Sequence, residues 1–389
     1  MWLSDEQATE VVAQHSSPVF VYSKSQLKSR AQTLLDLVMP FGLTIRYAVK
    51  ANSHPEVVKL FSDMGLHFDA SSSYEAAMLL SRGVPGEKIS LSSQQSAHNL
   101  EELLWAGVQY VATSLHQLEM FINAENRGNT VALRVNPAID HAGQNNRLST
   151  GGIAASFGLW HEHVEQALEL ASAHQVVINR LHTHIGSGAD PAIWAKAMET
   201  SLDIVRRMPD VTTLDFGGGY KVSRAAGEHE TDMQQIGAIF VEKLQTFAKE
   251  TGRRLRLEIE PGTWLVAHAG TLLAQVDDIV DTGSEGYTFL RVNTGMNDFI
   301  RPAMYGAQHD IRIVNGNSEQ TECVVTGHCC ETSDVLTPMP GDPEHIAPRT
   351  MRKASIGDVI AIADTGAYCA SMSTKQYNAY PSAPEVFVD

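Results

Sequence analysis

The chain has 389 residues, and its 29 basic and 45 acidic side chains give a formal net charge of −16 at pH 7. This length leaves room for two or three domains with large cores, and the acidic balance disfavours nucleic acid or an anionic membrane surface as a partner. No cationic start precedes an apolar run, and no stretch approaches the ~20 apolar residues that a membrane span requires. We therefore expect a cytoplasmic protein. Its four cysteines lie in the last quarter of the chain without zinc-like spacing, so neither a disulfide framework nor a structural metal is expected.

From Thr44 onward, short runs of β-branched and apolar residues alternate with longer segments whose apolar residues recur at three and four positions. Eight strand-then-helix units over ~220 residues predict an α/β fold with a TIM-type (β/α)8 barrel, and a doubly wound open sheet is the alternative. The eight predicted strands are residues 44–51, 66–71, 89–93, 109–114, 130–137, 178–186, 212–218 and 254–261.

After Thr263 the pattern changes to strand-like runs separated by turns rich in Gly, Asn, Asp and Pro, which predicts a separate C-terminal β domain. The early run 18–22 has no helix-paired neighbour and is expected to join that domain. Residues 337–350 carry four prolines and are expected to form an irregular surface loop. The expected domains are a barrel over residues 25–265 and a β-rich domain made of 1–24 plus 266–389. The predicted strands of the latter cover 271–280, 287–293, 310–316, 322–327, 359–364 and 385–389.

Polar residues or glycines stand at the end of every predicted barrel strand. A single strand-ending lysine is ordinarily just solvated, but catalytic groups of a barrel gather at the C-terminal ends of its strands. A lysine, a histidine, a glycine turn and a carboxylate on one rim therefore predict a functional site. The strand ends in chain order are Lys50, Asp69, Ser92, Ser114, Asn136, His184 with Ser187, Gly217 to Gly219, and Glu260.

The three glycines after the seventh strand let backbone amides approach an oxyanion closely, and barrels often bind a phosphate there, although three glycines also make a plain turn. Glu258 and Glu260 point to the same side by strand alternation. A buried carboxylate needs a cationic or donor partner. The alternative is a salt bridge from Glu260 to Arg253, Arg254 or Arg256.

His182 and His184 also share a face of their strand. Such a pair could hold a metal ion, as in metal-dependent hydrolases built on barrels. That alternative leaves the lysine unexplained and needs further ligands, so a packed and hydrogen-bonded His182 is the simpler interpretation. We expect no metal.

A lysine, a phosphate-binding turn, a stacking histidine and an acid together describe one cofactor, pyridoxal 5'-phosphate. The lysine forms a Schiff base, backbone amides hold the phosphate, and the carboxylate keeps the pyridine nitrogen protonated so that the ring accepts carbanion electrons. An acid at position 260 suits the loss of carbon dioxide, whereas an arginine there would favour racemisation.

On these residues the chain resembles the pyridoxal-phosphate decarboxylases of the alanine-racemase-like barrel fold (fold type III), and it is most similar to the diaminopimelate decarboxylases. The resemblance runs from about Pro18 to the end of the chain. It rests on the motifs YAVKAN (47–52), HIGSG (184–188), DFGGGY (215–220), EPG (260–262), NDFIRPAMY (297–305), HCCETSD (328–334), DTGAY (364–368) and SMSTKQYN (371–378).

The resemblance implies a role for each matching residue around the cofactor. Lys50 would be the Schiff-base lysine, His184 would stack on the ring and Glu260 would meet the pyridine nitrogen. Tyr368 would lie near both phosphate and substrate. The phosphate would be held by Ser187, Gly217, Gly218, Gly219 and Gly262.

The same resemblance implies substrate contacts from the last third of the chain. Arg301 and Tyr305 would bind a substrate carboxylate, a role that suits the guanidinium fork. Cys330 would deliver a proton after decarboxylation, and Glu331 would meet the distal amine of the substrate. In the family this Cys-Glu pair reaches into the partner's site, which implies a homodimer. The alternative for Cys330 is a buried small hydrophobe.

Three positions depart from the diaminopimelate decarboxylase pattern: Thr263 replaces a substrate-contacting arginine, Gly188 a glutamine and Tyr380 an arginine. The implied activity is decarboxylation of meso-diaminopimelate to L-lysine and carbon dioxide, in lysine biosynthesis. The departures keep open the same chemistry on ornithine, lysine, arginine, carboxynorspermidine or a siderophore precursor. An inactive cofactor-binding regulator and a racemase are further alternatives.

Overall fold

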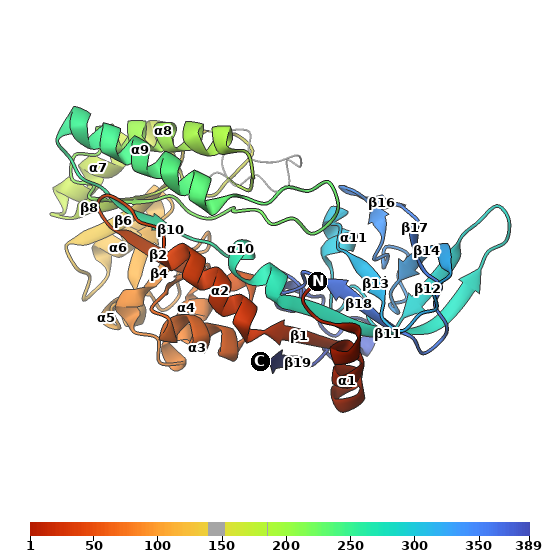
Figure 1. Cartoon of the computed structure of the whole chain (residues 1–389). Coiled ribbons are helices and arrows are strands. Elements are labelled where there is room, and N and C mark those ends of the chain that lie inside the picture. Colours follow the sequence, from red (N-terminus) through yellow and green to blue (C-terminus); the bar gives the residue numbers. More distant parts are fainter. Residues whose placement is uncertain (139–151, 185) are drawn as a thin grey trace. The chain divides into compact units, whose positions relative to one another are not determined.

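The computed structural model describes residues 1–138, 152–184 and 186–389, which fold into two compact units (Figure 1). We call them the barrel unit and the β unit. Within the described residues, no helix combines the length and the apolar character needed to cross a membrane. The barrel unit comprises Lys28–Lys221 and His229–Leu265, and the β unit comprises Met1–Leu27, Val222–Glu228 and Val266–Asp389.

The barrel unit contains eight parallel strands in the order β5-β4-β3-β2-β10-β9-β8-β6, and β6 pairs again with β5 to close the sheet. The predicted (β/α)8 barrel is therefore confirmed, and the open-sheet alternative is wrong. The strands are β2 Leu43–Ala48, β3 His67–Ala70, β4 Ile89–Ser92, β5 Gln109–Ala112, β6 Thr130–Asn136, β8 Val177–His182, β9 Thr213–Asp215 and β10 Arg256–Ile259; the short β7 Leu159–Trp160 pairs with β6.

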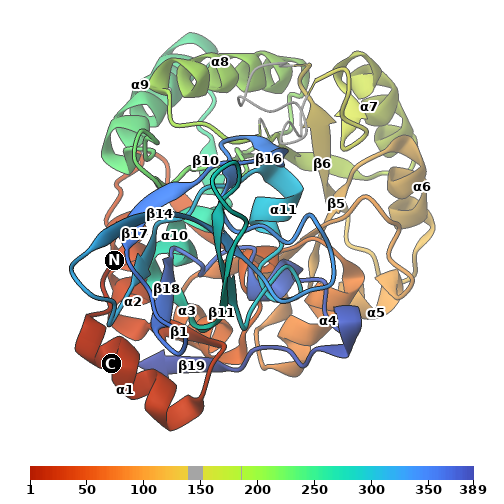
Figure 2. The same ribbon diagram turned by 90° about the vertical axis from the view of Figure 1, so that its right-hand side faces the viewer.

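Helices lie on the outside of these strands, as Figure 2 shows for α5 to α9. Several begin at a side chain that accepts a hydrogen bond from the first-turn amides, for example Ser72, Ser114 and Asp232. The helices are α2 Lys24–Leu35, α3 Pro55–Asp63, α4 Ser73–Ser81, α5 Leu100–Trp105, α6 Leu115–Asn123, α7 Val164–Ala173, α8 Pro191–Arg207, α9 Met233–Thr251 and α10 Thr263–Val266, with 3-10 turns η1 Val49–Ala51, η2 Gly86–Lys88 and η4 His161–His163.

The β unit is built on an eight-stranded sheet in the order β13-β18-β11-β12-β14-β17, with β1 pairing to both β11 and β19. The early run 18–22 thus joins this sheet, as predicted. Its core includes Phe20, Leu272, Leu290 and Phe299. The elements are α1 Asp5–His15, β1 Val19–Ser23, η5 Ala267–Ala269, β11 Gly270–Asp281, β12 Thr288–Val292, α11 Arg301–Tyr305, β13 Ile311–Ile313, β14 Gln320–Thr326, β15 Pro338–Met339, β16 Asp342–Ile346, β17 Arg349–Arg352, β18 Val359–Ala363, η6 Ala370–Met372, η7 Tyr377–Ala379 and β19 Glu385–Val388.

The expectation of an irregular loop over 337–350 is wrong. These residues form the two-stranded sheet β15-β16, and the next strand, β17, pairs with β14. The prolines are tolerated because a two-stranded sheet has only edge strands, whose outward amides need no partner. The turn between β15 and β16 contains Gly341 at a φ of 75°, which glycine adopts readily.

Candidate active site

The rim at the C-terminal ends of the barrel strands gathers the residues that the sequence singled out. Lys50 lies in η1 directly after β2, and Asp69 lies near the end of β3. His184 follows β8 by two residues, and Glu260 follows β10 directly. Not every strand end is functional. Ser114 caps α6 by accepting from the amide of Gln117 at 3.1 Å.

The glycine turn after β9 packs tightly between the segments of His184 and Glu260. The amide of Gly218 donates to Nδ1 of His184 at 3.1 Å, and the amide of Glu260 donates to the carbonyl of Gly217 at 2.8 Å. A Cβ at Gly217 would lie 2.5 Å from Nδ1 of His184, and a Cβ at Gly218 would overlap the carbonyl oxygen of Glu260. Side chains are therefore excluded here, and backbone lines this part of the rim.

The HIGSG segment is anchored beside the glycine turn, although Ile185 lies outside the described residues. The amide of Gly188 donates to the carbonyl of Gly219 at 3.1 Å. The carbonyl of Gly188 accepts from Nε1 of Trp194 on α8 at 3.0 Å and from the hydroxyl of Thr231 at 2.9 Å. Ser187 lies half-buried within this fixed segment.

Burial and nearby positive charges keep His184 neutral. Burial, followed by the charges of Arg134 and Lys50, holds the pKa of His184 well below its ordinary value. A neutral ring is consistent with Nδ1 accepting the Gly218 amide.

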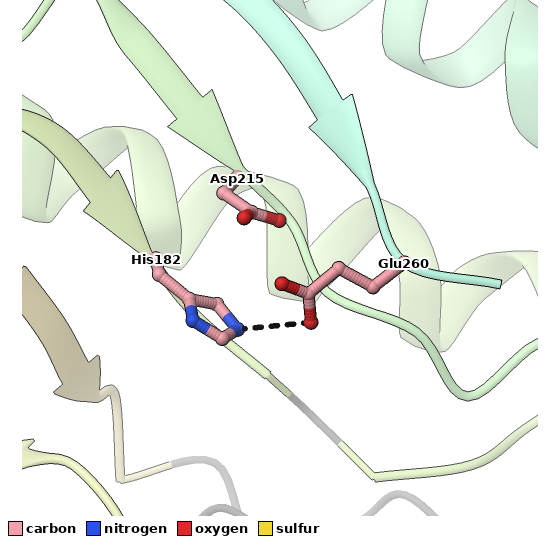
Figure 3. A group of neighbouring side chains, drawn as sticks. All are labelled: His182, Asp215 and Glu260. Atoms are coloured by element: carbon pink, nitrogen blue, oxygen red, sulfur yellow. Dashed lines mark ion pairs between the residues drawn. The ribbon is translucent and has the colours of Figure 1, made fainter. Parts of the chain in front are cut away.

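Glu260 points toward the barrel interior, where it faces His182 and Asp215 (Figure 3). Its Oε2 lies 3.3 Å from Nε2 of His182. The Glu260 side chain is 6% exposed, and its Oε1 has no hydrogen-bond partner among the described residues. Burial, followed by the charge of Asp215, raises the pKa of Glu260 to about 8.

The alternative salt bridge from Glu260 to a nearby arginine is wrong. Arg253 donates to the carbonyls of Val205, Met208 and Val211, and Arg256 donates to the hydroxyl of Thr44.

The interpretation of His182 as a packed and hydrogen-bonded residue is only half right. Its side chain is fully buried, but neither ring nitrogen makes a hydrogen bond among the described residues. Burial lowers the pKa of His182 to about 3.

An ion network that the sequence did not predict lies in the barrel interior. Arg46 binds both carboxylate oxygens of Glu258 at 2.8 and 3.0 Å. Arg180 pairs with the same carboxylate at 2.8 Å and also with Asp215. Burial alone would raise the pKa of Asp215, but Arg180, His182 and Arg46 together outweigh burial and hold this pKa below its ordinary value. Asp215 is therefore ionised, and its charge helps to keep the neighbouring Glu260 protonated.

His182, Asp215 and Glu260 offer ligand atoms that all lie within 4.8 Å of one another. This set differs from the His182 and His184 pair considered from the sequence, because Nδ1 of His184 is engaged by Gly218. Asp215 is already paired with the guanidinium of Arg180, which would repel a cation bound beside it. The arrangement therefore favours an exchangeable proton on Glu260 over a metal ion.

The predicted substrate contacts lie in the β unit. Arg301 is the first residue and Tyr305 the last residue of the short helix α11. Tyr368 follows β18 with a φ of 57°. Cys330 and Glu331 are exposed, which contradicts the alternative of a buried Cys330; the amide of Cys330 donates to Oδ1 of Asn378 at 2.8 Å.

Two departures from the family pattern have structural partners. Tyr380 stacks on His328 with ring centroids 3.7 Å apart, and its hydroxyl donates to the carbonyl of His328 at 3.0 Å. Thr263 begins α10 after Gly262, whose carbonyl accepts from the amide of Leu265. Neither residue supplies the positive charge that the corresponding family arginine carries.

Comparison with known proteins decides the family. The model of the pyridoxal-dependent decarboxylase family, pyridoxal binding domain, matches residues 24–267. The chain belongs to this family. A diaminopimelate decarboxylase of Streptomyces coelicolor is 33% identical over 100% of the chain and 88% of that protein. A crystal structure of diaminopimelate decarboxylase matches 99% of the chain and 92% of its own, with a TM-score of 0.90 and 30% identity. The Helicobacter pylori enzyme complexed with L-lysine matches 98% and 94%, with a TM-score of 0.86 and 27% identity.

As a member of the family, the chain is a pyridoxal-phosphate-dependent lyase, and the rim fits that cofactor. The glycine turn excludes side chains, which would let a phosphate approach the backbone closely. The unpartnered Oε1 of Glu260 is a buried acceptor that requires a donor, and a protonated ring nitrogen is one. Lys50 lies on the same rim and has the amine that such a cofactor requires.

Proposed function

We propose that the protein removes one carboxylate from meso-diaminopimelate to give L-lysine and carbon dioxide, the last step of a lysine biosynthetic route. The observation that carries the reaction type is Glu260, a buried carboxyl group with a free oxygen on the barrel rim. The full-length similarity to diaminopimelate decarboxylases supports the substrate.

Pyridoxal phosphate would be held by residues of the barrel rim. Lys50 would carry the cofactor covalently, and the phosphate would be bound by Ser187, the turn Gly217 to Gly219 and Gly262. Tyr368 of the β unit would complete the phosphate site. His184, kept neutral by its surroundings, would pack against the ring without adding a charge to it.

The bound cofactor supplies an electron sink for the bonding pair that stays behind when carbon dioxide leaves. Glu260 would share a proton with the ring nitrogen, and its raised pKa supports this role. After the carbon–carboxylate bond breaks, the thiol of Cys330 would give its proton to the same carbon and regain one from solvent. Arg301 and Tyr305 would hold a carboxylate, and Glu331 would accept a hydrogen bond from the distal ammonium group.

The exposure of Cys330 and Glu331 supports a homodimer in which this pair completes the partner's site. We also propose a cytoplasmic location, because all four cysteines are free thiols, as is usual in a reducing compartment. The barrel unit and the β unit are proposed as the two domains.

The test is carbon dioxide release from meso-diaminopimelate by the cofactor-loaded protein, compared with L-ornithine, L-lysine, L-arginine and carboxynorspermidine. Release from meso-diaminopimelate with L-lysine as product is expected, and Lys50→Ala should abolish both turnover and the visible absorbance of the bound cofactor. Faster release from any other amine would overturn the substrate. Full cofactor absorbance without release from any of them would favour the regulator alternative.

A further inference from the structure

Two arginines of the β unit lie beside the same segment, which contains His309. The carbonyl of Arg224 accepts from the amide of Asp310 at 3.1 Å, and the ring of His309 packs edge-on against Phe299, two residues before Arg301, with centroids 4.7 Å apart. Arg301 begins α11, and Arg224 lies in the short segment Val222–Glu228, which belongs to the β unit although its sequence neighbours belong to the barrel unit. Burial, followed by the charge of Arg301, lowers the pKa of Arg224 to about 9. Burial and the charges of the same two arginines hold the pKa of His309 well below its ordinary value.

Each of these three side chains has a buried donor or ring nitrogen without a partner. Arg224 is 9% exposed, yet its Nη2 makes no hydrogen bond among the described residues, and the same holds for Nε of Arg301 and Nε2 of His309. The rest of the Arg224 guanidinium is fixed, since Nε donates to the carbonyl of Asp364 at 3.3 Å. Across the described ranges, neither arginine forms an ion pair with a carboxylate.

Two acidic residues act on the charge of Arg224, but neither pairs with its guanidinium group among the described residues. Oδ1 of Asp364 lies 2.6 Å from Nδ1 of His268, and Oε2 of Glu228 accepts from the backbone amide of Arg224 at 2.8 Å. Their charges partly offset the lowered pKa of Arg224. The buried Arg224 and the half-buried Arg301 nevertheless each keep a buried donor without a partner, and like charges of this kind favour the binding of an anion.

The chemistry of decarboxylation indicates which carboxylate such a pair serves. The carboxylate that leaves loses its charge as carbon dioxide forms, so ion pairs to it would stabilise the ground state more than the transition state. A carboxylate that remains on the product keeps its charge throughout. Two guanidinium groups therefore suit the carboxylate that the product retains. Amino acids such as ornithine and lysine have a single carboxylate, so their decarboxylated products retain none.

We propose that Arg224 acts with Arg301 to bind the carboxylate that the substrate retains. This inference rests on the proposed function and narrows its substrate class to amino acids with two carboxylates. Arg224 contacts no reacting atom in this proposal; it determines specificity.

The experiment compares L-lysine with cadaverine, the same molecule without its carboxylate, by calorimetric binding to the cofactor-loaded protein. Arg224→Met should weaken L-lysine binding by about 10- to 100-fold, the usual value of a hydrogen bond to a charged group. Cadaverine binding should not change. For meso-diaminopimelate, KM should rise by a similar factor with a smaller change in kcat. Arg224→Lys, which keeps a charge but not the fork, should lie between the two.

Arg312→Met is the matched control, because Arg312 lies in the same unit but is engaged by the carboxylate of Asp5 and the carbonyl of Leu3. It should not change L-lysine affinity.

A purely structural arginine would behave differently from the one proposed here. If Arg224 binds ligand, Arg224→Met should not lower the Tm of the ligand-free protein, because it removes one of two repelling charges, but it should remove the rise in Tm that L-lysine causes.

Equal loss of L-lysine and cadaverine binding, or a lower ligand-free Tm with unchanged L-lysine affinity, would overturn the proposal while leaving the proposed function intact. If the wild-type protein neither acts on meso-diaminopimelate nor binds L-lysine, the proposed substrate is wrong. The binding of glutarate then tests whether Arg224 still binds a carboxylate. Glutarate binding that is lost in Arg224→Met would retain the pair as a carboxylate site. Absent or unchanged glutarate binding would reject it.

Discussion

Glu260 shows how a single residue that serves the proposed site can lower the stability of the folded protein. Its carboxyl group is buried beside the ionised Asp215, and its free oxygen has no partner among the described residues. Such a group opposes folding whenever it must ionise. The sequence placed Glu260 on the rim, because it follows a strand with an alternating pattern. It did not reveal the Arg180 to Asp215 pair that sets the charge of Glu260, because that pair joins two strands through the barrel interior.

The variant Glu260→Gln tests this conflict through pH. The carboxyl has a pKa of about 8 in the folded protein against an ordinary 4.5, so its contribution to stability is full below about pH 4.5 and is lost as pH rises through 8. The glutamine cannot ionise. In cofactor-free protein, the free energy of unfolding of Glu260→Gln relative to wild type should therefore increase between pH 5 and pH 8.5, by about 1 to 3 kcal/mol.

Carbon dioxide release by loaded Glu260→Gln should meanwhile fall by about 100-fold or more, because the ring nitrogen loses its acid. Urea unfolding at the two pH values and a turnover assay give both readouts. Glu322→Gln, an exposed position on β14, is the control and should change neither. A stability difference that is flat with pH would contradict the raised pKa.

At the level of elements, the glycine turn after β9 joins the ends of β8, β9 and β10 through its own backbone groups. Period and composition were sufficient to predict the eight barrel strands and the polar ends that they share. They overestimated strand length, since the predicted strand 178–186 ends at His182. Beyond that point the described residues are held by single contacts such as the one from the amide of Gly188 to the carbonyl of Gly219. The hairpin β15-β16 was missed because prolines argue against a central strand, whose amides must pair. An edge strand leaves some amides unpaired and therefore tolerates proline.

Gly218→Ala should disrupt this turn. The added Cβ overlaps the carbonyl oxygen of Glu260, so backbone must shift at the proposed phosphate site. We expect weaker pyridoxal phosphate binding, measured by titrating the absorbance of the bound cofactor, and a loss of about 1 to 3 kcal/mol in the free energy of unfolding. At Gly128 the nearest atom to an added Cβ is the amide nitrogen of Thr130 at 4.0 Å, so Gly128→Ala should leave both unchanged. Normal cofactor affinity in Gly218→Ala would remove the turn from the phosphate site.

At the level of the whole molecule, the proposed chemistry divides between a barrel that holds the cofactor and exposed groups of the β unit. The thiol of Cys330 is exposed while the adjacent Cys329 is buried, and its backbone is fixed by Asn378. A proton donor held at the surface in this way is of use only where another surface covers it. Sequence composition says nothing of which surface that is, because assembly depends on complementary faces and not on local pattern. We propose the partner subunit.

Mixing two inactive variants distinguishes a shared site from a self-contained one. Lys50→Ala lacks the proposed cofactor lysine, and Cys330→Ala lacks the proposed proton donor, so each homodimer should lose about 100-fold or more in turnover. If the site is shared, a mixed dimer has one site with both residues intact and one with neither. Equal mixing makes half of the dimers mixed, so activity should rise to about one quarter of wild type after subunit exchange. If each chain builds its own site, no mixed dimer contains an intact one, and the activity of the mixture should remain the average of the two variants. Mixing Lys50→Ala with Glu260→Gln provides the matched control, because both changes lie in the barrel unit. No chain in this mixture then has both Lys50 and Glu260. Recovery of activity in this control would mean that the rim itself is assembled from two chains.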